Sequence, residues 1–531
     1  MPAARDQYDE LKQAGCHIGR RVCLIGVDGK QHMGTVRYIG PIKPWPRNDA
    51  LGVEWDDLVR GKNDGSLEYK GQLYRYFNTK GDEKTGSFIK LPQEGIADDL
   101  IRLGKDRVLV VKGRSFSSAL EYKYDELDQI GRAEEEEQIM IGTKKVEKYG
   151  FDELIRRQAN FSSLEVVSLD NMLVNNEFEI NLVGRLLKSV TDLDLGHNLI
   201  SDWMQVVKVC DKLQTLKTLR LAGNRFHIVE IAGDNQIARL IIPSNDLEAC
   251  NLSTLSICFP NLYYVDFSDN RFVQFPETST IESIDLSFNR LGGRIILTGS
   301  SLRAINISDN QITGLEGTLT SLRVLDLSHN SIDSDWSFLD TFEEQFPHLE
   351  ALKLDGNPLF DQTDSQNGYD HCLMQIMGRV RTITKINGTE YSPEERNNYE
   401  LYFISKVKQG NTTKPKRTIW HYLLNKYGQK ETNSAIVTSS IKRPTEISVF
   451  NNEKLVLKQY VFAENTTLGK LKGKISKKLG LSVLHFTLFR KQADGIVERL
   501  DNDQEYLSHL GLQVVYIHTA PHMILDAPPH N

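Results

Sequence analysis

LRVLDLSHNSI, residues 322–332, shows the pattern that decides the fold of the middle of this chain. The same spacing, L-x-x-L-x-L-x-x-N-x-L, recurs in LRAINISDNQI (302–312) and IESIDLSFNRL (281–291). A degenerate first copy, LEVVSLDNMLV, begins at Leu164 and has Met172 where the asparagine is expected. The repeated asparagines are Asn198, Asn224, Asn245, Asn270, Asn289, Asn310, Asn330 and Asn357. Eight asparagines in register, about 23 residues apart, indicate one structural unit used many times.

The physical chemistry of this spacing predicts a leucine-rich repeat solenoid. The alternating leucines form a short strand whose two apolar side chains face one interior. The asparagine that follows can bind turn backbone through its side-chain amide, a need that returns in every coil. Because one coil cannot bury its apolar side alone, the coils stack and leave a concave sheet open. We expect this solenoid, with its closing cap, over residues 160–402.

The outward strand positions of the repeats carry several aspartates, namely Asp194, Asp266, Asp285 and Asp326. One interpretation is that they only keep an open sheet soluble. The other is that they form an acidic strip on the concave face, which docks a protein partner with basic patches. The sequence leaves both interpretations open.

Composition excludes several classes of protein. With 531 residues, 40% of them hydrophobic and 25% charged, the chain is expected to form several soluble globular domains. It has no run of about 20 apolar residues that could span a membrane, and its net charge of −7 disfavours nucleic-acid binding. Six scattered cysteines indicate a reducing compartment and predict neither disulfides nor a metal site. Common catalytic and nucleotide-binding motifs are missing, so we expect no enzyme and no cofactor.

The amino-terminal region has short alternating runs separated by glycines, which predict a small antiparallel β-barrel. GTVRYIG, LGVEW, GKNDG (61–65), LYRYF and GSFIKL follow one another in this order. This order resembles the CAP-Gly domain, a microtubule-associated module, and GKNDG is its most specific motif. Residues 18–95 also hold 13 lysines and arginines against 10 acidic residues, an excess that favours an anionic peptide.

The resemblance implies a site for the acidic carboxyl-terminal tail of α-tubulin and for similar tails that end in Glu-Glu-aromatic. The loop residues would be Gly61, Lys62, Asn63, Asp64 and Gly65, with Trp55, Phe77 and Phe88 as an aromatic wall. An anionic peptide end needs a cation, amide donors and such a wall. The alternative is that the glycines form a tight turn and the aromatics fill a small core. Many family members have tryptophan where this chain has Ala50, which leaves the tail preference open.

The carboxyl-terminal part falls into a basic linker, 403–443, and a predicted ubiquitin-like β-grasp domain, 444–531. The linker has nine lysines and arginines against one acidic residue, and the aromatic cluster at Trp420 indicates that part of it is helical. Beyond it come two alternating segments, TEISVFN and KLVLKQYVF, a helical run (467–481) and further strand patterns. This order of elements resembles ubiquitin-like domains.

The complete order of domains is similar to that of the tubulin-folding cofactor E family. It consists of a CAP-Gly domain in 1–105, a helical or linker segment in 106–159, then the repeats and the ubiquitin-like domain. The resemblance implies a cytoplasmic, cytoskeleton-associated chaperone that binds α-tubulin and helps assemble and dissociate the αβ-tubulin heterodimer. Its implied partners include the folding cofactors B, C and D. Two alternatives stay open: a CAP-Gly microtubule-associated scaffold or adaptor, and a ubiquitin-pathway shuttle that binds the proteasome. The sequence does not tell which solenoid face meets which tubulin subunit.

Overall fold

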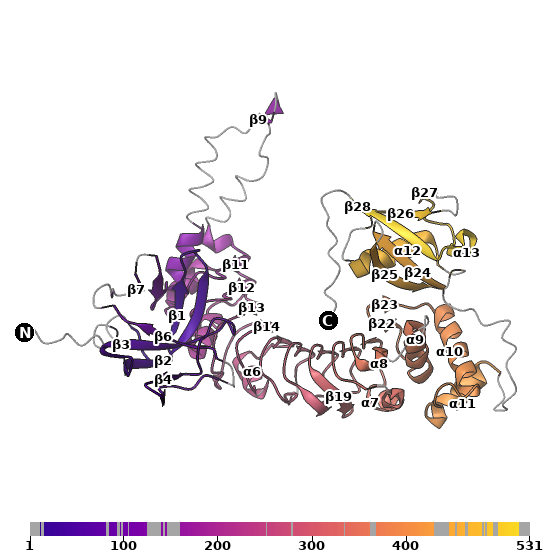
Figure 1. Ribbon diagram of the computed structural model, residues 1–531, viewed down its shortest axis with the longest axis horizontal. Coiled ribbons are helices and arrows are strands. Elements are labelled where there is room, and N and C mark those ends of the chain that lie inside the picture. The colour runs from indigo at the N-terminus through magenta and orange to yellow at the C-terminus, as the bar shows by residue number, and fades with distance from the viewer. Residues whose placement is uncertain are drawn as a thin grey trace, which may run out of the picture. The chain divides into compact units, whose positions relative to one another are not determined.

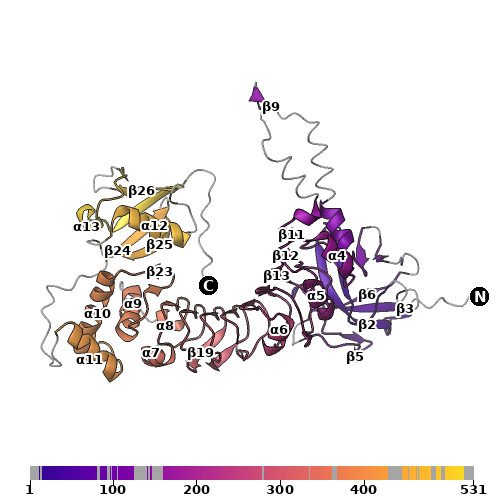
Figure 2. The same ribbon diagram turned by 180° about the vertical axis from the view of Figure 1, so that it is seen from behind.

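The chain forms two compact units, Met1–Arg290 and Leu291–Asn531, which we describe one at a time in the computed structural model (Figures 1 and 2). The residues that the structure describes are 11, 15–80, 84–92, 96, 99–104, 106–124, 140–141, 144–145, 160–250, 252–277, 280–333, 335–361, 368–428, 445–451, 454–461, 463, 466–479, 483, 486–491 and 497–519.

The amino-terminal domain is a six-stranded antiparallel sheet in the order β6-β3-β2-β1-β8-β7. Its core contains Val22, Val36, Leu51 and Val53, and most of their neighbours on β1 and β3 are buried as well. A separate hairpin of β4 and β5 follows the GKNDG loop. This confirms the short antiparallel strands that the sequence predicted. The strand bounds are β1 (Arg21–Ile25), β2 (Gln31–Ile42), β3 (Trp45–Trp55), β4 (Ser66–Tyr69), β5 (Gln72–Arg75), β6 (Gly86–Lys90), β7 (Leu100–Arg102) and β8 (Val108–Val110).

The amino-terminal domain joins the first coil of the solenoid through hydrogen-bonded backbone. Arg114 N donates to the Leu173 carbonyl oxygen (2.9 Å), and Asn175 N donates back to the Arg114 carbonyl oxygen (2.8 Å). A helical stretch, 116–124, then covers the end of the solenoid, with the rings of Phe116 and Phe178 5.9 Å apart. Cys23 of β1 also packs on Leu173 and Leu199 of the first coils. A two-residue pair, β9 (Met140–Ile141) and β10 (Lys144–Lys145), precedes the coils in sequence.

The first unit contains six parallel solenoid strands in sequence order, one from each coil. In each strand the middle residue is buried, as Leu193 and Leu219 are, and its two neighbours are more exposed. The degenerate copy at Leu164 forms the first of these strands. The elements are η1 (Phe161–Ser163), β11 (Val166–Ser168), α4 (Ile180–Leu186), β12 (Asp192–Asp194), α5 (Trp203–Cys210), β13 (Thr218–Arg220), β14 (Arg239–Ile241), α6 (Leu252–Cys258), β15 (Tyr264–Asp266) and β16 (Ser283–Asp285).

The repeat asparagines form a ladder of buried amides, as their spacing predicted. Asn198 Nδ2 donates to the carbonyl oxygens of Leu169, Leu195 and Gly196, each at 2.9 Å. Its Oδ1 accepts from Val174 N at 2.9 Å, so one side chain joins two coils. The residue before the asparagine has a left-handed backbone: His197 has φ 48°. Such buried polar groups stabilise a fold only when all their partners are present.

The second unit contains parallel coils of its own, which are closed by helices. Its cap buries the guanidinium of Arg379, which pairs with Asp340 (2.6 Å) and donates to Gln375 Oε1 (3.1 Å). The helix around Trp420 is confirmed, with that side chain buried. The elements are β17 (Gly292–Ile296), β18 (Ala304–Asn306), β19 (Gln311–Glu316), β20 (Val324–Asp326), η2 (Trp336–Thr341), α7 (Phe342–Gln345), β21 (Ala351–Lys353), α8 (Pro358–Asp361), α9 (Gly368–Arg379), β22 (Lys385–Ile386), β23 (Thr389–Glu390), α10 (Pro393–Lys408) and α11 (Arg417–Lys426).

The chain then forms a mixed five-stranded sheet in the order β25-β24-β28-β26-β27. Strands β24 and β28 are parallel and the other pairs antiparallel, and α12 packs its Leu468, Leu471 and Ile475 into the sheet's core (Figure 1). This is the order of strands and helix that the sequence predicted for this region. Most of the predicted linker's second half, 429–443, lies outside the described residues. The bounds are β24 (Thr445–Asn451), β25 (Lys454–Val461), α12 (Leu468–Leu479), β26 (Phe486–Lys491), β27 (Val497–Leu500), α13 (Leu507–Leu510) and β28 (Val514–Thr519).

Candidate peptide-binding site of the amino-terminal domain

The GKNDG loop is held against strand β6 by its backbone. Lys62 N and Asn63 N both donate to the carbonyl oxygen of Gly86, at 2.7 and 3.0 Å, and Gly86 N donates back to the Asn63 carbonyl oxygen (2.7 Å). Asn63 Oδ1 accepts from Gly65 N at 3.1 Å, which closes the turn. The Lys62 side chain stays exposed above this fixed backbone. The loop therefore presents one ammonium group from a rigid base.

The two loop glycines are required by close contacts. A Cβ at Gly61 would lie 1.9 Å from the carbonyl oxygen of Lys84, well inside any allowed contact. Gly65 has φ +87°, and a Cβ there would lie 2.2 Å from the carbonyl oxygen of Phe77. The tight-turn interpretation of these glycines is therefore correct, and it is compatible with a binding role for Lys62.

Asp64 fastens the loop to the neighbouring hairpin. Its carboxylate accepts from the Ser66 hydroxyl and pairs with Arg75 of β5 at 2.7 Å. These hydrogen bonds lower the pKa of Asp64 to about 2. The Asp64 carboxylate would repel an anionic ligand, so we do not expect it to bind one. Its pairing with Arg75 instead stabilises the loop.

A chain of aromatic rings lies beside the loop. The ring centroids of Phe77 and Phe88 are 5.3 Å apart, those of Phe88 and Tyr76 are 5.4 Å apart, and those of Tyr76 and Tyr38 are 5.2 Å apart. Phe88, Tyr76 and Tyr38 are half-buried and Phe77 is buried. Phe77 and Phe88 were candidate residues from the sequence, whereas both tyrosines were missed.

Trp55 belongs to the core and does not form part of this ring chain. Only 4% of its side chain is exposed, within the cluster that includes Leu51 and Val53. The guanidinium of Arg60 stacks on its ring at 4.9 Å. Ala50 is also buried, so its side chain adds nothing to the surface. The expected wall role of Trp55 therefore needs correcting: the residue fills the interior of the domain because its strand position faces the core.

The aspartates of the solenoid close turns within their own coils. Asp285 Oδ1 accepts from Ser287 N (2.9 Å) and Oγ (2.6 Å), and Asp326 does the same for Ser328. Asp326 also pairs with Lys353 at 2.5 Å. Asp194 and Asp266 each accept one backbone N–H at 2.9 Å, and burial raises the pKa of both carboxyl groups. Each aspartate thus has a structural role, whatever it binds.

Among the residues that the structure describes, no group of histidine, cysteine and acidic side chains could hold a metal ion. No helix within the same described ranges is long and apolar enough to cross a membrane. The six cysteines all lie within the described residues, and none of them forms a disulfide.

Parts of this chain match two protein families, and most of its length is similar to individual known proteins. The CAP-Gly domain family matches residues 18–93, and a leucine-rich repeat family matches residues 318–335. Protein PAC2 of Saccharomyces cerevisiae is 26% identical over 91% of this chain and 92% of its own. Tubulin-specific chaperone E of Homo sapiens is 26% identical over 93% of this chain and 97% of its own. The Drosophila melanogaster protein of the same name is 27% identical over 69% of this chain and 70% of its own.

Proposed function

We propose that this chain, a homologue of tubulin-specific chaperone E and PAC2 over about nine-tenths of its length, is a non-enzymatic tubulin-folding cofactor. The breadth of the similarity supports this proposal, because it includes the amino-terminal domain, the solenoid and the final mixed sheet. A generic microtubule adaptor would share only the CAP-Gly part. We place the protein in the cytoplasm, with the cytoskeleton as its working environment.

The observation that carries the proposal is an exposed Lys62 on a loop that is hydrogen-bonded to the ring-bearing segment, since Tyr76 N donates to the Gly65 carbonyl oxygen at 2.9 Å. The ring chain continues from Tyr76 to Phe88 and Tyr38. An ammonium group attracts the carboxylates of an acidic tail, and half-buried rings accept a terminal aromatic side chain. We assign the acidic tail of α-tubulin as the ligand. The other candidate residues maintain the shape of the site: Gly61, Asn63, Asp64, Gly65, Phe77 and Trp55.

The solenoid supplies the second contact in this proposal. Asp266 and Asp285 are neighbours across β15 and β16, and with Asp194 of the same unit they offer acidic side chains to basic patches on the tubulin client or on a folding cofactor. Asp326, in the second unit, is a further candidate of the same kind. When one client is held at two points, binding at the first point raises the effective concentration of the client at the second. This fits a protein that assembles and dissociates the αβ-tubulin heterodimer together with cofactors B, C and D.

Titration of the purified full chain with soluble αβ-tubulin tests the proposal. We expect a complex and a lower population of heterodimer, measured by analytical ultracentrifugation. Lys62→Ala should weaken the complex about tenfold, which is the size of one charge-assisted contact. Lys70→Ala is the matched control, because Lys70 is an exposed lysine at the other end of the β4–β5 hairpin.

Three outcomes would reject parts of this assignment. Decoration of microtubules with an unchanged heterodimer population would identify an adaptor. Proteasome binding without any tubulin complex would identify a ubiquitin-pathway shuttle. Equal affinities of Lys62→Ala and the unmodified chain would move the tail site elsewhere.

A further inference from the structure

Phe288 combines an exposed aromatic ring with a backbone conformation that favours small or polar residues. It follows strand β16 and directly precedes the ladder amide of Asn289. The residue is 60% exposed and its φ is 54°. A bulky side chain is rare in this left-handed region, because its Cβ comes too close to the following carbonyl oxygen. Phe288 therefore lowers the stability of the fold without gaining burial in return.

The fold imposes this backbone on each of the six coils in the first unit, and Phe288 is the one large apolar residue among the six. The residue before the ladder position is left-handed in every coil, and in the other five coils it is glycine or polar: Asn171, His197, Gly223, Ser244 and Asp269. Glycine, asparagine and aspartate adopt this conformation most readily. An apolar residue that the local geometry disfavours points to a function outside the fold itself.

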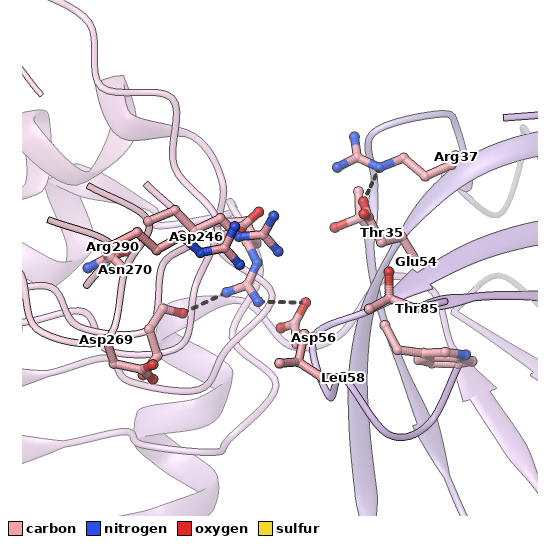
Figure 3. Close-up of a pocket in the computed structure, with 14 residues that line it drawn as sticks. Thr35, Arg37, Glu54, Asp56, Leu58, Thr85, Asp246, Asp269, Asn270 and Arg290 are labelled. Atoms are coloured by element: carbon pink, nitrogen blue, oxygen red, sulfur yellow. Dashed lines mark hydrogen bonds and ion pairs between the residues drawn. The ribbon is translucent and has the colours of Figure 1, made fainter. Parts of the chain in front are cut away.

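The amino-terminal domain faces the same edge of the solenoid in the preceding coils. Gly223 and Ser244 line a cavity together with His32 of β2. Asp269 lines a second cavity, of about 230 Å³, together with residues of β2 and β3 (Figure 3). Phe288 occupies the next position in this series, so it lies on the same edge, one coil further along the solenoid.

Matched charges fix the amino-terminal domain to the coils at the second cavity. Arg225 of the solenoid pairs with Asp56 of that domain at 3.1 Å, and its Nη1 donates to the Ser244 carbonyl oxygen at 2.7 Å. The four arginines that line this cavity are balanced by four carboxylates, so the cavity offers no net charge to a ligand. Its lining includes Arg290, two residues after Phe288. The aromatic ring therefore stands beside a fixed junction.

The peptide-binding loop adjoins this cavity from the side of the amino-terminal domain. Thr85, which also lines the cavity, directly precedes Gly86, whose carbonyl oxygen accepts from Lys62 N. A protein whose tail end is bound at the loop has its folded body within the length of that tail, about 3.3 Å for each extended residue. The solenoid edge that carries Phe288 lies within this reach, because a single small cavity separates Thr85 from Arg290.

We propose that Phe288 contacts an apolar surface on the folded body of the client whose acidic tail binds at the Lys62 loop. The inference rests on the proposed function and adds a contact site for the same client. Aromatic side chains are enriched in the buried centres of protein interfaces. A ring held on a rigid turn also loses little conformational freedom when it binds. Contact at Phe288 and capture of the tail would therefore reinforce each other.

Two ligands and two variants of the full chain test the proposal: soluble αβ-tubulin and a short acidic peptide that ends in Glu-Glu-Tyr, measured by fluorescence anisotropy. Phe288→Asn removes the ring and places a residue that tolerates the left-handed backbone. We expect its affinity for αβ-tubulin to fall about tenfold, as for a truncated interface anchor, with peptide affinity unchanged. Phe288→Tyr keeps the ring and should retain the affinity of the unmodified chain for both ligands.

Thermal unfolding separates a binding role from a structural role. Phe288→Asn should raise the unfolding midpoint by about 2–4 °C, because it relieves the disfavoured backbone. A ring that the fold needs would give a lower midpoint, and that result would overturn the inference. Met204→Gln is the matched control, since Met204 is an apolar residue of α5 that is 44% exposed and glutamine has a similar helix propensity. It should leave αβ-tubulin affinity unchanged.

The outcomes also separate this inference from the proposed function. If Phe288→Asn binds αβ-tubulin as tightly as the unmodified chain or Met204→Gln, the assignment of Phe288 is wrong, while binding of the short peptide still supports the tail site. An equal loss of peptide affinity in Phe288→Asn would contradict a contact with the client's body. If neither ligand binds the unmodified chain, the proposed function fails and this inference fails with it.

Discussion

Asparagine occurs in two contrasting situations in this molecule, the amide ladder of the solenoid and the GKNDG loop of the amino-terminal domain. Asn330 is buried, donates to three carbonyl oxygens and accepts from Ile312 N at 3.0 Å. Asn63 is half-buried, and its backbone fixes a loop whose neighbour, Lys62, is exposed. A polar residue that recurs with the repeat period is therefore part of the fold, whereas Asn63 occurs once and shapes a single loop that exposes a lysine.

Removing a ladder amide should have the largest effect on stability. A small effect would show that the ladder contributes no more to the fold than the loop does. Asn330→Ala leaves the carbonyl oxygens of Ile307, Leu327 and Ser328 without their donor. We expect the free energy of unfolding to fall by about 3–4 kcal/mol, measured by urea denaturation followed by circular dichroism. Asn425→Ala, on the exposed face of α11, is the control and should change it by less than about 0.5 kcal/mol.

A methyl group in the loop tests whether its backbone must approach β6 so closely. Gly61→Ala would place Cβ 1.9 Å from the Lys84 carbonyl oxygen. We expect a loss of about 2–3 kcal/mol in stability and at least a tenfold loss of acidic-peptide affinity. Gly473→Ala in α12 meets no atom within 4 Å and should be slightly stabilising, because alanine favours helix. Unchanged peptide binding in Gly61→Ala would show that loop shape is unimportant.

Asp370 of α9 is a buried carboxyl group, in contrast to the buried amides of the asparagine ladder. Burial raises the pKa of Asp370 to about 7, while it accepts from the Tyr399 hydroxyl (3.2 Å) and faces Glu446 and Tyr460. A carboxyl group whose pKa is higher in the folded state makes stability decrease as pH rises from about 4 to about 7. Asp370→Asn should flatten this dependence.

Thermal unfolding of Asp370→Asn and the unmodified chain at pH 5 and pH 8 gives the measurement. The variant should gain about 1–2 kcal/mol relative to the unmodified chain at pH 8 and less at pH 5. Parallel pH profiles would mean that Asp370 titrates normally.

The smallest expected effect concerns the aspartates that close the solenoid turns. Asp285→Asn keeps the Oδ1 acceptor for Ser287 and removes the charge, so stability should change by less than about 0.5 kcal/mol. Affinity for αβ-tubulin should fall about twofold if the strip docks a basic patch as proposed. Asp285→Ala, which loses the acceptor, should cost about 1 kcal/mol. Unchanged affinity in Asp285→Asn would leave this residue with its turn role alone.

The solenoid and the final mixed sheet could be predicted because their signals lie in local spacing. Leu193 and Asn198 stand in a pattern that every coil repeats, and α12 shows its apolar stripe in sequence. Trp55 could not be assigned correctly, because an aromatic residue near a loop looks the same in sequence whether it faces the core or a groove. Tyr76 and its ring contacts depend on how distant strands meet.

The junction between the amino-terminal domain and the solenoid, where Arg225 pairs with Asp56, could not be predicted either. Arg225 and Asp56 come from different domains, and nothing in the local pattern of either residue indicates the other.

The hydrogen-bonded join between Arg114 and the first coil fixes the direction in which the amino-terminal domain faces relative to the coils of the first unit. If its loop binds an acidic tail as proposed, this fixed direction would favour proteins whose tail leaves their folded body at a matching place and angle. A flexible tether in place of the join would accept any protein with a suitable acidic end.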